Sequence, residues 1–335
     1  MQQTVAPSPA LIFDAFQGHQ RTAALKAAMD LELFTAIGDG ANTTAAIASS
    51  CRASVRGVRV LCDFLTILGF LTKSGDRYEL TPDSAVFLNK RSPAYMGGIA
   101  DFIASPDFIT RFSDLAGIVR RGGPEETAMV PDNPMWVVFA RTMAPMMAMP
   151  AQRLAELLGV QNAGPLRVLD VAAGHGLFGL AVAQANPQAE ITALDWKPVL
   201  DVAVENATKA GVAARFHTRA GDAVTMDLGG PYDLVLVPNF IHHFDVATCT
   251  AFFRNVRDGL AKGGRVAILD FVPDENRITP PTAAAFAMTM LGVTSSGDAY
   301  TFADYQRMLG DAGFKSIELH QLPPTMEQVV TGVNA

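Results

Sequence analysis

LRVLDVAAGHGLFGLAVAQA, residues 166–185, is the stretch that decides the fold. Its first six residues form an apolar run of strand length, and the residues after Gly176 read as a buried helix. Gly174, Gly176 and Gly179 stand between and inside these elements as a G-x-G-x-x-G pattern. Glycines in such a turn let the backbone approach a ligand closely and place a helix N-terminus beside it. The stretch therefore predicts a strand, a ligand-binding turn and a helix.

The same alternation continues along the chain. After the strand at residues 166–171, further buried strands are predicted at residues 191–194, 214–218, 234–237 and 265–271, with helices at residues 177–185, 200–210 and 247–260. Strands that alternate with helices are typical of a doubly wound parallel sheet. Such sheets bind ligands beyond the carboxyl ends of their strands. We therefore expect a Rossmann-like α/β domain with its site at that edge.

Two classes of cofactor fit the glycine turn. Asp195 ends the second strand, nineteen residues after Gly176, where its carboxylate can accept hydrogen bonds from both hydroxyls of a ribose. Trp196 follows directly and is included in the predicted site. On these residues alone, a nicotinamide-dependent oxidoreductase is a serious alternative.

Three features favour S-adenosylmethionine over a dinucleotide. Asp170 ends the first strand, where a carboxylate suits an ammonium group and would repel a pyrophosphate. Gly221 and Asp222 follow the third strand, and Asp222 can accept a hydrogen bond from an adenine amino group or, equally well, cap its own loop. A single sheet domain also ends the sequence, with no second half for a dinucleotide.

The residues after the fourth strand carry candidate catalytic groups. They read Pro238-Asn239-Phe240-Ile241-His242-His243-Phe244. A histidine at this edge can take a proton from a substrate hydroxyl as that hydroxyl attacks a methyl group. We expect one of the two histidines to be the base and the other to have a structural role; the pattern alone does not choose between them.

The first hundred residues have the outline of a winged helix. Helices are predicted at residues 24–37, 43–50 and 54–69, followed by a hairpin of residues 70–73 and 78–81. That outline raises a DNA-binding regulator as a further hypothesis. However, these hundred residues hold nine Lys or Arg and eight Asp or Glu, and the third helix is mostly apolar. A packing surface, and hence dimerisation, is favoured over groove recognition.

Composition limits the remaining classes. Hydrophobic residues make up 49% of the 335 residues and charged residues 18%, so we expect two globular domains with a large core. The net charge of -7 argues against nucleic acid as a partner. No apolar run reaches the roughly 18 residues of a membrane span, and the N-terminus lacks the pattern of a secretion signal. Three cysteines without disulfide or metal-ligand spacing suit the cytoplasm and predict no metal site.

The division that we expect is a winged-helix-like domain at residues 1–105, a helical connector at 106–155 and a catalytic domain at 156–335. Methionines gather in the connector and again near residue 288. Methionines usually fill cores, but Met143 and Met288 lie where two such stretches could line an apolar substrate cavity.

Taken together, these motifs resemble the two-domain O-methyltransferase family that includes plant caffeic acid and chalcone enzymes and bacterial hydroxyindole-type enzymes. The resemblance covers residues 18–330 and includes the cofactor motif from Val168 to Gly176, with Ala172 and Ala173 at two positions where the family usually has glycine. It implies a class I methyltransferase sheet domain, S-adenosylmethionine as cofactor, and a homodimer formed through the N-terminal domain.

The resemblance also assigns catalytic roles. It selects His242 as the base and Asp270, at the end of the fifth strand, as the acid that orients it. The family's second acidic position falls on Ala299, and Asp298 beside it is the candidate substitute. The segment Phe139-Ala140-Arg141-Thr142-Met143 resembles one whose Phe and Met contact the substrate.

The prediction is therefore an S-adenosylmethionine-dependent transferase that methylates a hydroxyl of a small aromatic or apolar acceptor. S- or C-methylation on the same fold is the alternative, because a thiol acceptor needs little help from a base.

Overall fold

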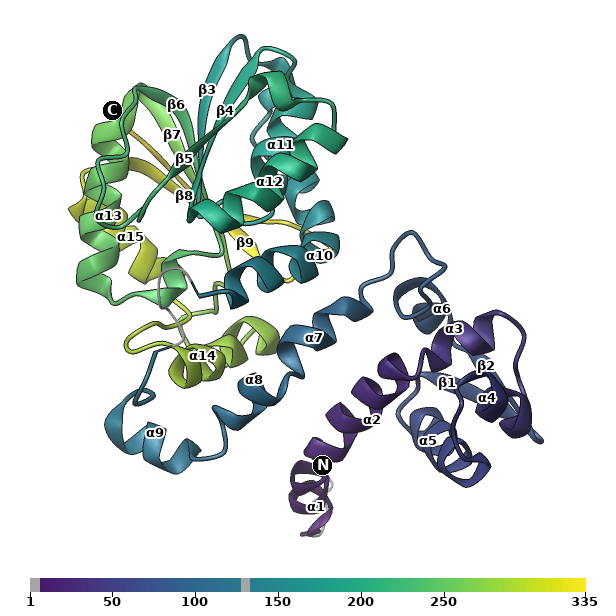
Figure 1. Ribbon diagram of the computed structural model, residues 1–335. Helices are drawn as coiled ribbons and strands as arrows, with labels where there is room; N and C mark the ends of the chain where they lie inside the picture. The colour runs from purple at the N-terminus through teal and green to yellow at the C-terminus, as the bar shows by residue number, and fades with distance from the viewer. Residues whose placement is uncertain (1–6, 128–132) are drawn as a thin grey trace, which may run out of the picture. The chain divides into compact units, whose positions relative to one another are not determined.

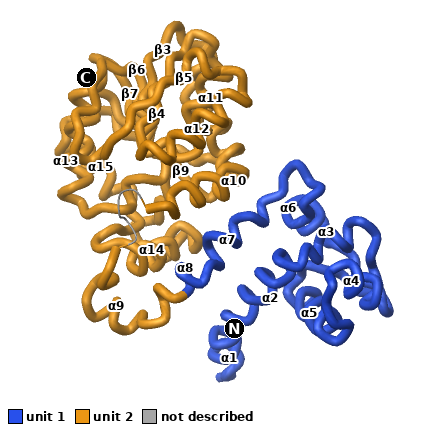
Figure 2. The backbone as a smooth tube through the Cα atoms, viewed as in Figure 1, with its two compact units in different colours: residues 1–109 blue, residues 110–335 orange. Residues whose placement is uncertain are grey.

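The computed structural model describes residues 7–127 and 133–335. These residues form two compact units, divided between Ile109 and Thr110 (Figures 1 and 2). Residues 1–6 of the predicted first domain and residues 128–132 of the predicted connector lie outside the described residues. The division into three parts stays a proposal.

Unit 1 is helical with one hairpin. It contains α1 (Ala10–Phe16), α2 (Gly18–Asp30), α3 (Leu33–Gly38), α4 (Thr44–Ser50), α5 (Val55–Ile67), β1 (Leu71–Ser74), β2 (Arg77–Leu80), α6 (Pro82–Phe87) and α7 (Ala100–Ile103), and α8 (Pro106–Thr110) crosses into unit 2. The side chains of Thr43 and Ser54 accept the N–H groups of Ala46 and Gly57 and so begin α4 and α5. The predicted winged-helix outline is confirmed.

The prediction of a single helix at residues 24–37 is wrong, because these residues belong to two helices, α2 and α3. Glu32 has a left-handed backbone with φ of 53°, which an α-helix cannot continue through. The helix axis therefore changes direction before α3, and all five residues from Leu33 to Ile37 are buried. Apolar spacing alone suggested one continuous helix, since both halves bury residues in the same core.

Unit 2 is built on a seven-stranded sheet with the strand order β5-β4-β3-β6-β7-β9-β8. The strands are β3 (Leu166–Val171), β4 (Ala189–Asp195), β5 (Phe216–Ala220), β6 (Tyr232–Pro238), β7 (Leu260–Asp270), β8 (Lys315–Gln321) and β9 (Gln328–Val333). The five predicted strands are present and parallel, which confirms the fold class. The last two strands were not predicted, and β9 runs antiparallel between β7 and β8.

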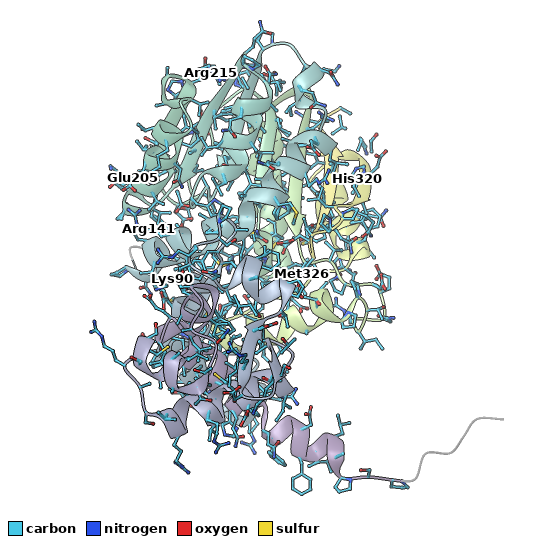
Figure 3. All side chains as sticks on the ribbon, turned by 90° about the vertical axis from the view of Figure 1, so that its right-hand side faces the viewer. Lys90, Arg141, Glu205, Arg215, His320 and Met326 are labelled. Carbon is cyan, nitrogen blue, oxygen red and sulfur yellow. The ribbon has the colours of Figure 1, made fainter. Side chains whose placement is uncertain are left out.

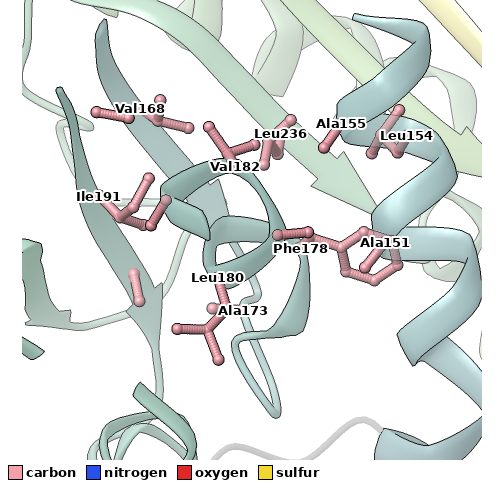
Figure 4. Packing of buried hydrophobic residues seen from close by; sticks show 14 of the residues in the cluster. Ala151, Leu154, Ala155, Val168, Ala173, Phe178, Leu180, Val182, Ile191 and Leu236 are labelled. Atoms are coloured by element: carbon pink, nitrogen blue, oxygen red, sulfur yellow. The ribbon is translucent and has the colours of Figure 1, made fainter. Parts of the chain in front are cut away.

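Helices cover both faces of this sheet (Figure 1). One face carries α10 (Met135–Leu157), α11 (Leu177–Ala185) and α12 (Lys197–Lys209), and the other carries α13 (Val246–Gly259) and α15 (Phe302–Asp311). Figure 4 shows Phe178 and Val182 of α11 packed between α10 and the sheet. The remaining helices are α9 (Leu115–Arg121) and α14 (Pro281–Val293).

Helix α10 is the longest helix among the described residues, and it contains Pro145 and Pro150. Arg141 on α10 forms two 2.8 Å hydrogen bonds to the Glu205 carboxylate on α12 (Figure 3). The charged pair links α10 to α12. Within residues 7–127 and 133–335, no helix combines the length and apolarity that a membrane crossing would need.

Candidate active site

The glycine turn connects β3 to α11 at the carboxyl edge of the sheet. Gly176 has φ of 75°, and a Cβ atom there would lie 2.9 Å from the Cβ of Ala203. Both facts require glycine, because an L side chain is strained in this conformation and would collide with α12. Ala172 adopts φ of 49° without being glycine. The turn therefore has a left-handed backbone at both Ala172 and Gly176, directly after β3.

Asp170 is fully buried beneath this turn. Its Oδ2 accepts the N–H of Gly179 at 2.8 Å, and its Oδ1 has no partner. Burial raises the pKa of Asp170 to about 7; the Gly179 N–H opposes the shift and the charge of Asp195 adds to it. A buried carboxyl oxygen without a donor is costly, so this atom suits a donor supplied by a ligand.

Asp195 holds the turn from the neighbouring strand. It accepts the N–H of Gly174 at 2.8 Å and the N–H of Trp196 at 2.7 Å. Burial raises the pKa of Asp195 to about 6, against the effect of these two donors. The sequence predicted Asp195 only as a ligand contact, and the structure adds that it orders the glycine turn.

A cavity of about 210 Å³ opens beside Asp195. Four predicted residues, Asp195, Trp196, Gly221 and Asp222, line it, together with seven that were not predicted: Trp136, Ala172, Leu194, Ala223, Val224, Phe240 and Phe244. Asp222 also caps its own loop, since its Oδ1 accepts the N–H of Val224 at 2.9 Å. Both interpretations of Asp222 are therefore compatible with its position.

The donors of S-adenosylmethionine fit this set of acceptors. Within the described residues, two buried side-chain oxygens lack a hydrogen-bond partner, Asp170 Oδ1 and Asn239 Oδ1. Asp170 is the last residue but one of β3, and Asn239 directly follows the neighbouring strand β6. The Asn239 amide is oriented by Met147, because its Nδ2 lies 3.5 Å from a thioether sulfur that can only accept. Ammonium and ribose hydroxyl groups are donors, whereas a pyrophosphate would add negative charge beside Asp170 and Asp195.

His242 and Asp270 are brought together by the ends of two neighbouring strands. The His242 Nδ1 lies 2.6 Å from Asp270 Oδ1, and both side chains are buried. An ionised carboxylate can only accept, so Nδ1 carries the proton and Nε2 has its lone pair free. The arrangement produces an oriented imidazole that can accept a proton.

His243 has a different environment. Its Nδ1 donates to the carbonyl of Phe240 at 3.0 Å, and its ring centre lies 4.2 Å from that of His242. Burial, and then the charge of His242, hold the pKa of His243 well below its ordinary value. His243 therefore resists protonation, and a base that resists protonation is a poor one.

The backbone of His242 is clamped by the loop after α14. The carbonyl of His242 accepts the N–H of Asp298 at 3.0 Å, and a Cβ on Gly297 would lie 2.1 Å from the same carbonyl oxygen. The substitution of Asp298 for the acid missing at Ala299 stays a prediction. The Asp298 carboxylate is paired with Arg277 at 3.0 Å, and the group that contacts His242 is the backbone N–H of Asp298.

Aromatic rings surround the histidines. Phe286 of α14 lies edge-on to His242, with ring centres 4.8 Å apart, and is stacked on Phe271 at 4.3 Å. Trp136 of α10 lies 6.4 Å from His243. A planar, apolar molecule is the natural complement of such walls.

The three predicted substrate residues lie on the helices beside this region. Phe139 packs edge-on against Trp136, with centres 6.1 Å apart. Met143 is partly buried against the sheet core, whereas Met288 is 49% exposed on α14, two residues after Phe286. None of the three lines the cavity beside Asp195.

Two buried polar residues of the site escaped prediction. Tyr305 on α15 donates its hydroxyl to Asp270 Oδ2 at 2.9 Å. Glu327 precedes β9, whose first residue pairs with Asp270, and burial raises the pKa of Glu327. Tyr305 lies on the apolar face of an amphipathic helix, where the sequence pattern predicts a core residue. Glu327 directly precedes β9, a strand that was not predicted. The sequence pattern therefore indicated a site role for neither residue.

Comparison with known proteins gives two family matches. Residues 121–315 match an O-methyltransferase domain, and residues 13–90 match an O-methyltransferase dimerisation domain. The first match alone covers more than half of the chain.

Similar proteins extend over the whole chain. The crystal structure of a candidate O-methyltransferase of Nostoc punctiforme is 50% identical, with a TM-score of 0.94 over 98% of this chain and 100% of that one. The 3-hydroxy-5-methyl-1-naphthoate 3-O-methyltransferase of Streptomyces sahachiroi is 28% identical over 98% of this chain and 96% of its own length. Human N-acetylserotonin methyltransferase, solved with S-adenosylmethionine, shares the fold at 20% identity and a TM-score of 0.85, over the full length of both chains.

Proposed function

The chain belongs to the O-methyltransferase family and depends on S-adenosylmethionine, and from that premise we propose that His242 is its catalytic base. This family membership argues against the nicotinamide-dependent oxidoreductase that the glycine turn also allowed. The acceptor that we propose is a hydroxyl on a small aromatic molecule, supported by the rings of Phe286, Phe271 and Trp136 around the histidines. The naphthoate substrate in the name of the Streptomyces relative has the same character.

The cofactor, when bound, supplies an electrophilic methyl group on a sulfonium. The residues that we propose to hold it are Asp170, Gly174, Gly176, Asp195, Trp196, Gly221 and Asp222. Among them, Asp195 and Asp222 line the cavity and Asp170 offers an unpaired oxygen. The two glycines bring the backbone close enough for direct contact.

The single observation that carries the base assignment is the 2.6 Å contact of His242 Nδ1 with Asp270. It fixes the tautomer whose Nε2 can remove a proton from the acceptor hydroxyl, and the carboxylate stabilises the imidazolium that results. His243 lacks a carboxylate, and its pKa is held low. Proton removal is therefore assigned to His242.

We also propose that the chain works as a homodimer and that α10 and α14 form the acceptor pocket. Helix α1 supports the first point, because Leu11, Ile12, Phe13 and Phe16 are all more than half exposed at the edge of the dimerisation domain. Phe139, Met143 and Met288 are the residues proposed to contact the acceptor, as neighbours of Trp136 and Phe286.

The test is a methyl-transfer screen over phenols, hydroxy acids and thiols, followed by His242→Ala on the best acceptor. The variant should lose roughly a hundredfold or more in kcat, while its affinity for S-adenosylhomocysteine changes little. His243→Gln is the matched control and should lose far less. Full turnover by His242→Ala would contradict the base assignment and point to S- or C-methylation.

A further inference from the structure

The Asp270 carboxylate is held from three directions. Its Oδ1 faces His242 at 2.6 Å and accepts the N–H of Phe271 at 2.8 Å. Its Oδ2 accepts the hydroxyl of Tyr305 at 2.9 Å. The exposed fractions of His242, Asp270 and Tyr305 are 4%, 1% and 0%, so water does not compete for these hydrogen bonds.

Tyr305 can only be a donor at this position. Burial and the neighbouring Asp270 carboxylate raise the pKa of Tyr305 well above its ordinary value, so the phenol keeps its proton. A phenol that faces a carboxylate oxygen must donate to it. The hydrogen bond therefore runs from Tyr305 to Asp270.

The helix that carries Tyr305 is itself fixed at its start. Thr301 and Asp304 form a reciprocal capping box at the beginning of α15, and Asp304 is paired with both Arg277 and Arg307. Tyr305 follows Asp304 directly. Its hydroxyl is therefore presented to Asp270 by a rigid element.

We infer that Tyr305 is a positioning residue for the methyl-transfer reaction, acting through Asp270 on the orientation and basicity of His242. The inference deepens the proposed function and rests on His242 being the base. Tyr305 holds Oδ2, so the carboxylate keeps Oδ1 directed at the imidazole. By sharing the negative charge of Asp270, Tyr305 also limits how strongly that charge favours protonated His242 before the acceptor binds.

Tyr305→Phe removes one oxygen and retains the ring in the core. The expected result is a kcat roughly tenfold lower, because Asp270 loses a charge-assisted hydrogen bond, with a nearly unchanged KM. The acid limb of the pH–activity profile should move to higher pH. A loss of activity without movement of that limb would overturn the inference.

Tyr300→Phe is the matched control. Tyr300 is buried beside Tyr305, with ring centres 6.2 Å apart, and its hydroxyl donates to the Phe244 carbonyl and not to Asp270. The control should lower thermal stability while the acid limb stays in place. If the limb moves equally in both variants, then general loosening and not the Asp270 contact is responsible.

A double-mutant cycle tests whether Tyr305 acts through Asp270. Asp270→Asn should be slow, and adding Tyr305→Phe to it should lower kcat no further. Independent, multiplicative losses would overturn the inference. The same cycle measured as thermal stability of the ligand-free protein should also be non-additive, and it keeps its meaning even if His242→Ala shows that the base assignment has failed.

Incorporation of 3-fluorotyrosine at position 305 covers the case in which Tyr305→Phe does not fold. The fluorinated phenol is a stronger acid and a stronger donor, so the acid limb should move to lower pH. An unchanged profile with this residue would contradict the inference.

Discussion

At the residue scale, the carboxyl groups of Asp170 and Asp195 lie at the carboxyl edge of the sheet, where Asp170 is buried and Asp195 lines the cavity. Their pKa values are raised to about 7 and about 6, mainly by burial. The ligand groups expected there are hydrogen-bond donors, which bind an ionised carboxylate better than a neutral one. Binding should therefore lower both pKa values and release protons.

The resulting prediction concerns S-adenosylhomocysteine affinity as a function of pH. The dissociation constant should fall as the pH rises from roughly 5 to roughly 8 and then level off, because both groups are ionised above their folded-state pKa values. Calorimetry in two buffers of different ionisation enthalpy should detect proton release near pH 6–7. Asp170→Asn should weaken the pH dependence. Equal affinity across this window would be evidence against the role of both carboxyl groups.

Gly297 leaves room for the backbone carbonyl of His242, the proposed base. In Gly297→Ala the new Cβ would lie 2.1 Å from the His242 carbonyl oxygen, so the backbone of His242 must move. We expect kcat to fall roughly tenfold through misplacement of the imidazole, with S-adenosylhomocysteine affinity nearly unchanged.

Gly310→Ala is the control for this substitution. Its Cβ would meet no atom within 4 Å, and alanine should stabilise α15 by about 0.5–1 kcal/mol. Wild-type turnover by Gly297→Ala would show that the clamp on His242 is unnecessary.

At the scale of elements, α15 is the helix that begins with a capping box and carries Tyr305 directly after it. Thr301 begins the helix through its side chain and shares a capping box with Asp304. Thr301→Ala should cost about 1 kcal/mol and lower Tm by roughly 2–4 °C. Thermal denaturation measures this directly.

The matched control is Thr208→Ala on α12. Thr208 is exposed within its helix and bonds only the Val204 carbonyl, so alanine there should be neutral or stabilising. If Thr301→Ala matched the control in Tm, the capping box would contribute nothing to stability.

The elements that the sequence predicted are those whose signal is local. The strand at 166–171 and the helix at 177–185 have the bounds expected from their apolar runs. Strand β8 alternates between exposed and partly buried residues at the sheet edge, which gives a weak pattern. The break at Glu32 depends on tertiary packing of α3, and no residue type marks it.

The candidate site was predictable to the extent that strand ends collect polar residues. Asp195 and Asp222 follow from that rule, whereas the pairing of His242 with Asp270 was implied by the family resemblance. Tyr305 follows from neither, because its contact with Asp270 joins residues 35 positions apart through a helix whose placement no local pattern contains. The ion pair between Asp298 and Arg277 likewise joins two different loops, so no local sequence pattern predicts it.

At the scale of the whole molecule, the prediction concerns assembly. Phe13→Asp together with Phe16→Asp places two charges on the exposed apolar face of α1, which should prevent burial of that face against a second copy. Light scattering after size-exclusion chromatography should then report the mass of a monomer, whereas the unmodified protein should give the mass of the proposed dimer.

Val119→Asp and Val204→Asp together serve as the control. Both valines are exposed on unit 2, outside the dimerisation domain, so a dimer should persist. A dimer that survives the α1 substitutions would remove α1 from the proposed interface.

The place of β9 in the sheet has a consequence for biosynthesis. Strand β8 is made before β9, yet its place in the sheet is secured only through β9, which lies between it and β7. While the ribosome has translated β8 and not β9, that segment has no neighbour to pair with. Strand β8 can therefore pair in the sheet only once β9 lies beside β7, and the pairing of β9 brings Glu327 to the edge that holds Asp270.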